Sequence, residues 1–325
     1  MKIAALSGGV GGAKFLLGLY RAIDPRDLTI IANTGDDIVF NGLHVSPDPD
    51  IITYTLAGVI NPETGWGFKG ETFRTAERLS IYGRPTWFNL GDKDLATHIH
   101  RTALLKNGAM LSEAAESIRT ALGVTACILP MSDQRVTTIL ETDEGPLHLQ
   151  DYLVRRRAEP KLRGIAYEGA AKAKPAPGVL ERLEKADLII ICPSNPLISI
   201  GPILALPGIR EMLKKRRDDV LAISPLVGGK SLKGPSDKMM AELGYEVSVR
   251  GVAKLYRDLC ATMVIDALDT EDAASVELLG MNAVLLPTIM RTDADKERLA
   301  REVLAWFEAR DEPMTQLICS PYSYR

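Results

Sequence analysis

IAALSGGVGGAKFLLGL, residues 3–19, joins a short apolar run to a helical pattern through four glycines in five positions. The run Lys2–Leu6 predicts a buried strand, and the apolar spacing over Ala13–Ile23 predicts a helix. A glycine turn between them offers unobstructed backbone amides and the positive end of the helix dipole, which together attract an anion. We therefore expect a phosphate here, although a tight turn that binds nothing would also need glycine. The candidate nucleotide-binding residues are Gly8, Gly9, Gly11 and Gly12.

Two known phosphate motifs nearly match this loop. The dinucleotide fingerprint G-x-G-x-x-G fails because Lys14 occupies its sixth position, which disfavours a nicotinamide-dependent dehydrogenase. The P-loop pattern fails because Ala13 follows Gly12. Lys14 would add a cation beside a bound nucleotide, unless it points away from the sheet as a surface residue.

The same alternation of strand and helix returns later in the chain. Apolar runs predict strands at Leu28–Ala32, Ala186–Cys192, Asp219–Ser224 and Asn282–Pro287. Helical patterns occupy Ile203–Lys215, Ser236–Leu243, Val252–Leu259 and Thr292–Ala309. Buried strands that alternate with helices are typical of a parallel sheet covered on both faces. The predicted fold is therefore α/β, with a Rossmann-like parallel-sheet core.

The middle of the chain follows another pattern. Asp94–Lys106 and Ser112–Ala121 predict consecutive helices, and Val136–Leu140 with Pro146–Gln150 predicts a β-hairpin across the turn TDEG. We interpret residues 55–175, approximately, as an inserted helical-plus-hairpin subdomain of a single domain spanning residues 1–308. Residues 309–325 are expected to form a C-terminal tail.

Composition excludes several classes of protein. The net charge of −3 gives no basic field for nucleic acid or an anionic membrane, and no apolar run approaches the roughly 20 residues of a membrane span. We interpret the basic runs at residues 155–157 and 214–217 as solvated faces. Cys127 and Cys192 lie in apolar runs and no CxxC pair occurs, so a cytoplasmic location is expected.

Two acidic segments follow the second predicted strand. NTGDD ends at Asp37, and VSPDPD ends at Asp50. Ligands of open parallel sheets bind outside the carboxyl ends of the strands, so these segments and the glycine loop should share one crevice. One carboxylate from each segment, Asp36 and Asp50, would make a compact oxygen site for Mg²⁺. A solvated turn and a proline-stiffened surface loop are the alternatives.

Three further segments could complete the crevice. TWFNLGDKD, residues 86–94, suggests a pocket wall, although its Trp87 and Phe88 could simply be core. His98 and His100, which follow it, are two residues apart and do not share a helix face, so a two-histidine metal site is not expected. Small polar residues after two buried strands would suit a nucleotide, with helix capping as the alternative. These residues are Ser194, Asn195 and Ser224.

No Ser-His-Asp or Cys-His arrangement is apparent, so chemistry would come from positioning, a metal and neutralisation of phosphate, as phosphoryl transfer requires.

Seven motifs occur along the chain in a fixed order: SGGVGGAKFLLGL, NTGDD, GLHVSPDPDIITYTLAG, WFNLGDKDLATH, ILPMSD, PSNPLISIGPIL and SPLVGGKSLKGP. Together they resemble the 2-phospho-L-lactate transferase family over about residues 1–308.

The resemblance implies a magnesium-dependent transferase that acts in making the deazaflavin coenzyme F420. A guanosine diphosphate-linked donor would carry phospholactate or phosphoenolpyruvate, the acceptor would be the ribityl hydroxyl of the precursor Fo, and GMP would leave. The motifs do not report which acid the donor carries. A homodimer is also expected.

Residue by residue, the resemblance assigns the glycine loop and the Ser194–Asn195 turn to the nucleotide. It makes Asp36 and Asp50 the catalytic and metal-binding residues, and it places Asp50 and Asn89 against Fo. The main rival is a nucleotide-sugar-binding regulatory protein of the gluconeogenesis-factor type, which shares the glycine-rich start and the acidic turn. Such a binder has no reason to carry VSPDPD or WFNLGDKD.

Overall fold

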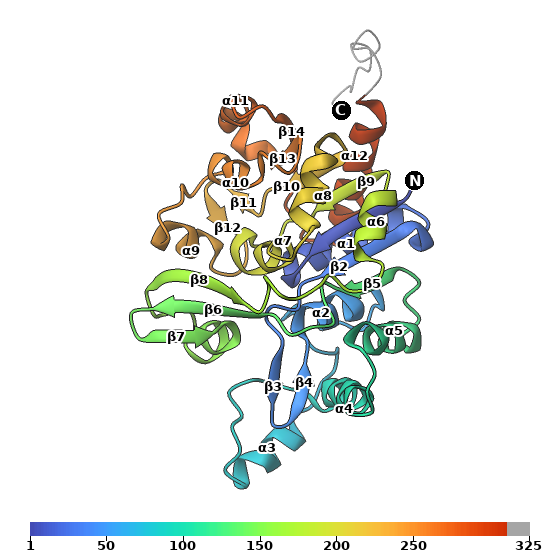
Figure 1. The fold of residues 1–325 in the computed structure, drawn as a ribbon, viewed down its shortest axis with the longest axis vertical. Helices are drawn as coiled ribbons and strands as arrows, with labels where there is room; N and C mark the ends of the chain where they lie inside the picture. Colours follow the sequence, from blue (N-terminus) through green and yellow to red (C-terminus); the bar gives the residue numbers. More distant parts are fainter. Residues whose placement is uncertain (311–325) are drawn as a thin grey trace.

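A seven-stranded parallel sheet forms the centre of the computed structural model, which describes residues 1–310 (Figure 1). Its strands lie in the order β14-β13-β10-β9-β1-β2-β5. Their bounds are β1 Ile3–Ser7, β2 Leu28–Ala32, β5 Cys127–Pro130, β9 Leu188–Ile191, β10 Val220–Ile223, β13 Thr262–Asp266 and β14 Asn282–Leu286. The predicted α/β class with a Rossmann-like parallel sheet is confirmed.

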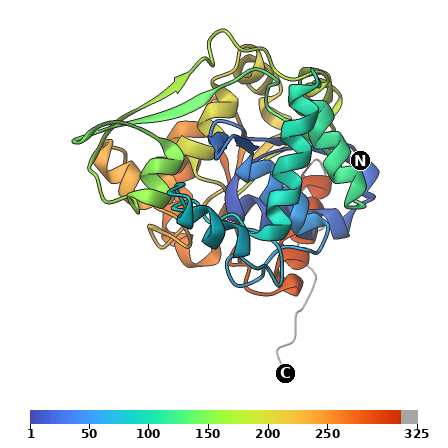
Figure 2. The ribbon, with the colours of Figure 1, turned by 90° about the horizontal axis from the view of Figure 1, so that it is seen from below.

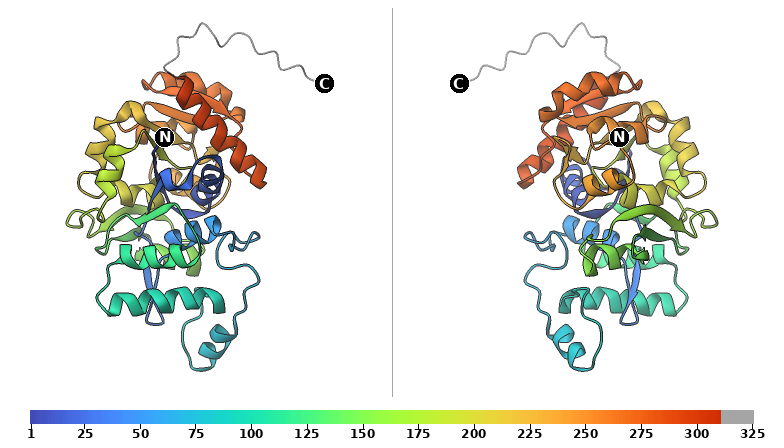
Figure 3. Two further views of the ribbon diagram at one scale, coloured as in Figure 1. Left: turned by 90° about the vertical axis from the view of Figure 1, so that its right-hand side faces the viewer. Right: turned by 90° about the vertical axis from the view of Figure 1, so that its left-hand side faces the viewer.

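Helices cover both faces of this sheet because alternate strand residues point to opposite sides. On one face, Ile30 and Ile190 pack with helix α1 (Gly9–Ala22), helix α2 (Pro47–Leu56) and helix α12 (Asp293–Ala309). On the other face, Ile31 and Ile191 pack with α6 (Val179–Lys185), α7 (Gly201–Leu204), α8 (Ile209–Lys215), α9 (Ser236–Glu242) and α10 (Val249–Tyr256). Figure 3 shows α12, in red, crossing the outside of the molecule.

The strand order reverses between β1 and β9. The chain runs from β1 to β2 and β5 on one side, and from β9 to β10, β13 and β14 on the other. The connections that leave the carboxyl ends of β1 and β9 therefore diverge and open a crevice, the usual ligand site of such sheets. The glycine loop follows β1, and the turn Pro193–Asn195 follows β9.

Most of the chain between β2 and β9 lies below and to the side of the sheet (Figures 1 and 2). A hairpin of β3 (Ile38–Phe40) and β4 (Leu43–Val45) extends toward α3 (Arg74–Ile81), and α4 (Asp92–Lys106) packs on α5 (Leu111–Ala121). A second, antiparallel sheet has the order β7-β6-β8, with β6 Thr137–Thr142, β7 Gly145–His148 and β8 Leu162–Glu168. The smaller elements are β11 Leu226–Val227, β12 Lys230–Ser231 and α11 Ala273–Glu277, the π-helical turns η2 Asp151–Arg155 and η3 Pro196–Ile200, and the 3₁₀ turns η1 Pro25–Asp27, η4 Arg217–Asp219 and η5 Ala267–Asp272.

Several local predictions need correction. Helix α1 begins at Gly9, not at Ala13, so three of the four glycines lie in its first turn. VSPDPD is not a loop, because Pro47 opens α2, a position where proline costs no hydrogen bond. The helix predicted over Ile203–Lys215 is broken after Leu204, and strand β13 was not predicted.

The division into a domain at residues 1–308 with an insertion at 55–175 stays a prediction, although β5, within that range, belongs to the main sheet. The predicted tail lies outside the described residues beyond Arg310. Within residues 1–310, no single helix is long and apolar enough to cross a membrane. The helices Pro196–Leu204 and Ile209–Lys215 reach the length and hydropathy of a membrane span only when they are taken together, and they are bent by 91° relative to each other.

Candidate active site

One large cavity of about 890 Å³ lies at the crevice between β1 and β9. Its lining includes every residue expected from the sequence to bind a ligand except Gly12. The cavity is lined by Gly8, Gly9, Gly11, Lys14, Asp36, Asp50, Asn89, Ser194, Asn195 and Ser224, among others. The structure thus brings these segments together around one space. Their individual roles stay predictions.

The glycines are required by close approaches within the protein. A Cβ on Gly8 would lie 2.3 Å from Oδ2 of Asp48, and one on Gly11 would lie 2.5 Å from the carbonyl oxygen of Pro193. A Cβ on Gly12 would meet the hydroxyl of Ser194 at 2.5 Å. Gly11 and Gly12 therefore let α1 pack directly against the turn after β9, and Gly8 lets Asp48 approach, so packing alone already requires these glycines.

The amides of the glycine loop are partly occupied. The backbone N–H of Gly9 donates to Oδ1 of Asp48 at 2.7 Å, so a carboxylate of the protein caps the start of α1. The amides of Val10 and Gly11, in the first turn of the helix, have no intrahelical acceptor. These two amides are the ones that could face an anion.

A stability prediction follows from the position of Gly11. Gly11→Ala is expected to destabilise the fold by about 1–3 kcal/mol, because the new methyl group would collide with backbone rather than with a flexible side chain. Urea unfolding monitored by circular dichroism measures the change. Gly164→Ala is the matched control, since its Cβ would meet Glu141 at an ordinary 3.5 Å. Equal effects of both substitutions would contradict the packing role of Gly11.

Asp36 and Asp48 form one acidic group in the cavity wall. Both are buried, and Asn33 Nδ2 donates to Asp48 at 2.9 Å and to Asp36 at 3.4 Å. Gln150 Nε2 donates to the other oxygen of Asp36 at 3.0 Å. No lysine or arginine pairs with either carboxylate within residues 1–310. The group is therefore held by amides, without a compensating cation.

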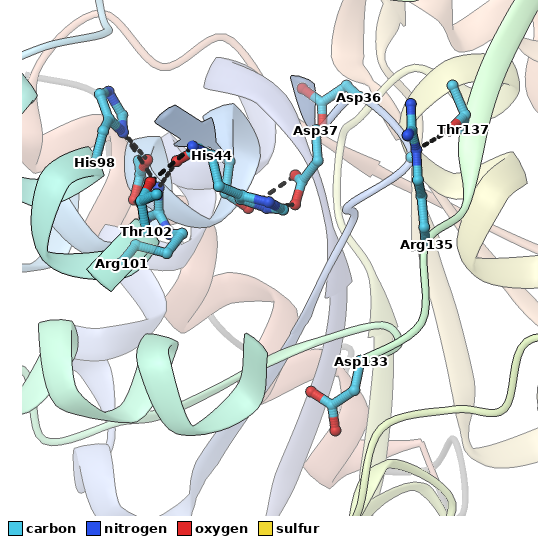
Figure 4. Close-up of polar contacts among 12 residues, drawn as sticks. Asp36, Asp37, His44, His98, Arg101, Thr102, Asp133, Arg135 and Thr137 are labelled. Carbon is cyan, nitrogen blue, oxygen red and sulfur yellow. Dashed lines mark hydrogen bonds and ion pairs between the residues drawn. The ribbon is translucent and has the colours of Figure 1, made fainter. Parts of the chain in front are cut away.

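Because no lysine or arginine of residues 1–310 pairs with this acidic group, the pKa values of its carboxyl groups are shifted upward. Burial, reinforced by the neighbouring carboxylates of Asp48 and Asp37, raises the pKa of Asp36 well above its ordinary value. Burial also raises the pKa of Asp48 to about 6. Asp37 has partners of its own: its Oδ2 lies 2.8 Å from His44 Nε2 (Figure 4), and its Oδ1 accepts a hydrogen bond from Ser46 Oγ at 2.7 Å. A buried acidic pair in this state is suited to a bound cation.

Asp50 belongs to a second acidic group on the other side of α2. Its Oδ1 pairs with Arg101, and its Oδ2 is buried with no hydrogen-bond donor. Ligand atoms of Asp50, Asp94 and His98 all lie within 4.8 Å of one another, so this buried group could hold a metal ion. Burial raises the pKa of Asp50, while Arg101 and His98 partly oppose the shift.

Sequence reasoning missed Asp94 and His98 as companions of Asp50. Helix α4 brings them there, because residues 94 and 98 are four apart and share one helix face. Figure 4 shows His98 beside Arg101, which also lies on α4. His100, in contrast, lies on the exposed side and contacts Ser117. The i, i+4 spacing of Asp94 and His98 was the available signal.

The polar turns after β9 and β10 have structural roles as well as a place in the cavity. Oδ1 of Asn195 accepts hydrogen bonds from the amides of Leu197 and Ile198, which is the capping alternative. Ser194 Oγ donates to the carbonyl oxygen of Gly8 at 2.7 Å. Ser224 Oγ donates to Leu226 O at 3.0 Å. Their assignment to a nucleotide stays a prediction.

Asn89 and the aromatic residues before it occupy the opposite rim. Asn89 is exposed and lines the cavity. Trp87 and Phe88 pack with Phe40 in a small apolar cluster, with ring centroids 5.2 and 5.8 Å from that of Phe40. Phe88 also reaches the cavity, so it serves both as core and as wall.

Lys233 is a cavity residue that the sequence analysis did not single out. It belongs to the segment after β12, and its Nζ donates to the carbonyl oxygen of Thr64. The turn at Gly65, whose φ is +75°, packs on both Lys233 and Val10. Burial and the nearby charge of Lys14 lower the pKa of Lys233, so two ammonium groups gather near the glycine loop. Neither has a carboxylate partner within residues 1–310.

Known proteins are similar to this chain over most of its length. The model of the family described as 2-phospho-L-lactate transferase CofD matches residues 3–303. A phosphoenolpyruvate transferase of Streptomyces griseus is 44% identical over 311 residues, covering 94% of this chain and 98% of the relative. A 2-phospho-L-lactate transferase of Methanosarcina mazei is 40% identical over 301 residues, covering 93% and 99%.

Solved structures add information on the fold alone. A member of the UPF0052 family from Bacillus halodurans superposes with a TM-score of 0.62 at 16% identity, covering 93% of this chain and 98% of that one. The match confirms the Rossmann-like architecture. At this identity it carries no argument about activity.

Proposed function

The chain belongs to the 2-phospho-L-lactate transferase family, and on that premise we propose which group it transfers. It moves a phospholactyl or phosphoenolpyruvyl group from a guanosine diphosphate-linked donor to the ribityl hydroxyl of Fo, and GMP leaves. The reaction serves the synthesis of coenzyme F420. Among relatives of this chain, some are named for phosphoenolpyruvate and others for 2-phospho-L-lactate.

The observation that carries the proposal is the composition of the large cavity between β1 and β9. Its lining holds the first turn of α1 with Lys14 and Lys233, and also the two buried acidic groups around Asp36 and Asp50, the first of which adjoins α1 through Asp48. A nucleotide diphosphate needs the amides and cations, and a reacting phosphorus with its metal needs the carboxylates. The cavity therefore offers the two chemistries that such a transfer combines.

We propose Mg²⁺ as the metal, with Asp36 as a ligand in the first acidic group, beside Asp48, and Asp50 as a ligand in the second, beside Asp94 and His98. The residues present fit this ion, because both carboxylates are buried and Oδ2 of Asp50 accepts no hydrogen bond. Oxygen ligands are those that Mg²⁺ prefers. When bound, the ion would neutralise phosphate charge and polarise the phosphorus under attack. Asp48 and Asp94 are further carboxylates within reach of the two proposed ligands.

The remaining steps belong to the chain itself. The free amides of Val10 and Gly11, with Lys14, would bind the phosphate of the departing GMP and offset its growing charge. Asn89 and Asp50 would orient Fo so that its hydroxyl faces the phosphorus. The ribityl oxygen of Fo forms a bond to the phosphorus that carries the acid. The bond from that phosphorus to the bridging oxygen breaks, GMP leaves with this oxygen and its electron pair, and the hydroxyl proton passes to water. The nucleotide roles of Ser194, Asn195 and Ser224 rest on their place in the lining.

The rival proposal, a regulatory protein that binds a nucleotide sugar, accounts for the glycine loop and the acidic turn after β2. It leaves the buried Asp50, Asp94 and His98 group without a purpose. Homodimer formation and a cytoplasmic location stay predictions from the sequence.

The proposal is tested with the purified chain, Mg²⁺, Fo and a guanylyl donor made enzymatically from phospholactate, phosphoenolpyruvate or phosphoglycerate. We expect a phosphorylated deazaflavin and GMP by mass spectrometry with the phospholactyl or the phosphoenolpyruvyl donor. A folded sample that yields no product with either would refute the transferase proposal. Because the three donors are assayed in parallel, the experiment also shows which acid the donor must carry.

A further inference from the structure

We propose that Arg157 binds an anionic group of the donor, either a phosphate or the carboxylate of its acid. The inference rests on the proposed function, because that function supplies a polyanionic substrate. Arg157 is the last of three consecutive arginines that the sequence analysis interpreted as a solvated face. Its environment differs from that of the other two.

The two preceding arginines have acidic partners on the surface. Arg155 lies 3.5 Å from Asp151, and Arg156 lies 2.9 Å from Glu144. Arg157 pairs with no carboxylate of residues 1–310. It lines the large cavity instead. An arginine without a partner at the wall of a ligand cavity is available to a ligand.

The wall that carries Arg157 begins at the acidic group of the site. Gln150, which donates to Asp36, lies directly before the turn η2, and Leu153, Val154 and Arg157 continue the same lining. A polyanion brought to Asp36 and Asp48 would meet repulsion unless cations surround it. Lys14 and Lys233 supply positive charge near the glycine loop, and Arg157 supplies it on the Gln150 wall.

The backbone at Arg157 is held in an unfavourable conformation. Arg157 and Ala158 have φ values of +51° and +55°, in the left-handed region that residues with a Cβ rarely adopt. Strain of this kind is retained where the surrounding structure enforces it, and it clusters at functional sites. All three arginines are exposed, but Arg157, at the left-handed turn, lines the cavity, and Arg155 and Arg156 do not.

Lys238, on α9, enforces this turn. Its Nζ donates to the carbonyl oxygens of Ala158 and, at 3.0 Å, of Pro160, and to the hydroxyl of Tyr152 at 3.1 Å. The amide of Ala158 donates to Tyr152 O at 2.8 Å. One ammonium group thus gathers three oxygens around the strained residues. Lys238 is therefore a positioning residue for Arg157.

The chemistry of the guanidinium defines its ligand. Arginine presents a planar set of N–H donors that matches carboxylate and phosphate oxygens in pairs, and it stays charged at any working pH. Both oxygen groups occur in the proposed donor, the phosphates at the nucleotide and the carboxylate at the acid. The experiment must therefore distinguish the two ends of the donor.

The first experiment compares Arg157→Ala and Arg157→Lys with Arg155→Ala as the matched surface control. We expect Arg157→Ala to raise KM for the donor by ~10-fold or more, Arg157→Lys to restore part of the loss, and KM for Fo to stay unchanged. Isothermal titration with GDP shows whether the phosphates are the ligand. Inhibition by lactate or pyruvate, which carry the carboxylate without a phosphate, shows whether the carboxylate is.

A second comparison separates binding from a structural role. Arg157→Gly relieves the left-handed strain, so it should keep or raise Tm while it weakens donor binding as Arg157→Ala does. Introduced alone, Lys238→Met should raise KM for the donor. Introduced together with Arg157→Ala, it should add little to the effect of Arg157→Ala, because both substitutions act through the same contact.

Donor KM, GDP affinity and inhibition by lactate or pyruvate that all match the Arg155→Ala control would overturn the proposal. A wild-type chain that transfers nothing would instead refute the proposed function. In that case GDP titration of the same variants still tests Arg157 for phosphate, and titration with lactate or pyruvate tests it for carboxylate.

Discussion

Asp50→Asn is expected to lower kcat by ~10²–10⁴-fold while guanine-nucleotide binding stays intact. The amide keeps the shape of the side chain and can still contact Arg101, but it removes the negative charge beside Asp94 and His98. Because Asp50 lies on α2 and the glycine loop on α1, the nucleotide wall should not be disturbed. Steady-state kinetics and GDP titration on the same sample measure the two effects.

The control for Asp50 is its ion-pair partner. Removing one member of a buried pair leaves the other uncompensated and destabilises the fold, so Tm must be recorded for each variant. Arg101→Gln breaks the same pair while it keeps the Asp50 carboxylate. If Asp50 acts only by anchoring Arg101, both variants should lose activity equally. A parallel loss of turnover and GDP binding in folded Asp50→Asn would mean that the carboxylate serves the nucleotide.

The sheet was predictable because its strands carry a local signal. Leu28–Ala32 was predicted to the residue, since a continuous apolar run marks a buried parallel strand. Thr262–Asp266 was missed, because TMVID follows the apolar end of α10 after a break of only a few residues. The start of α1 was placed too late because glycine is a poor helix former. Packing overrides that propensity at Gly11 and Gly12, where any side chain would collide.

The site was predictable where it follows strand ends. Asp36 and Asp50 lie after β2 and at the start of α2, and both reach the cavity, as the strand-end rule predicts. His98 and Arg157 could not be placed this way. Their positions depend on how α4 packs beside α2 and on how Lys238 bends the chain after η2, which are contacts between distant parts of the sequence.

The requirement for a divalent metal gives the second large effect. Treatment with EDTA is expected to abolish turnover, and Mg²⁺ should restore it. Asp36→Asn should raise the Mg²⁺ concentration for half-maximal activity by ~10-fold or more, because it removes a proposed charged ligand. Asp37→Asn is the matched control, since the neighbouring carboxylate binds His44 and Ser46 and does not line the cavity. Activity measured against Mg²⁺ concentration distinguishes the two variants.

The pH dependence of metal binding provides an independent test. Burial raises the pKa of Asp48 to about 6 and that of Asp36 well above its ordinary value. Between about pH 4 and 6 the folded metal-free chain therefore holds protons that the unfolded chain has lost, so these groups favour folding more as the pH falls through that window. Mg²⁺ competes with those protons. The rise in Tm on adding Mg²⁺ should thus be larger at pH 7.5 than at pH 5.5, and Asp36→Asn should diminish it. An equal rise at both pH values, or full turnover in EDTA, would place the metal away from this acidic group.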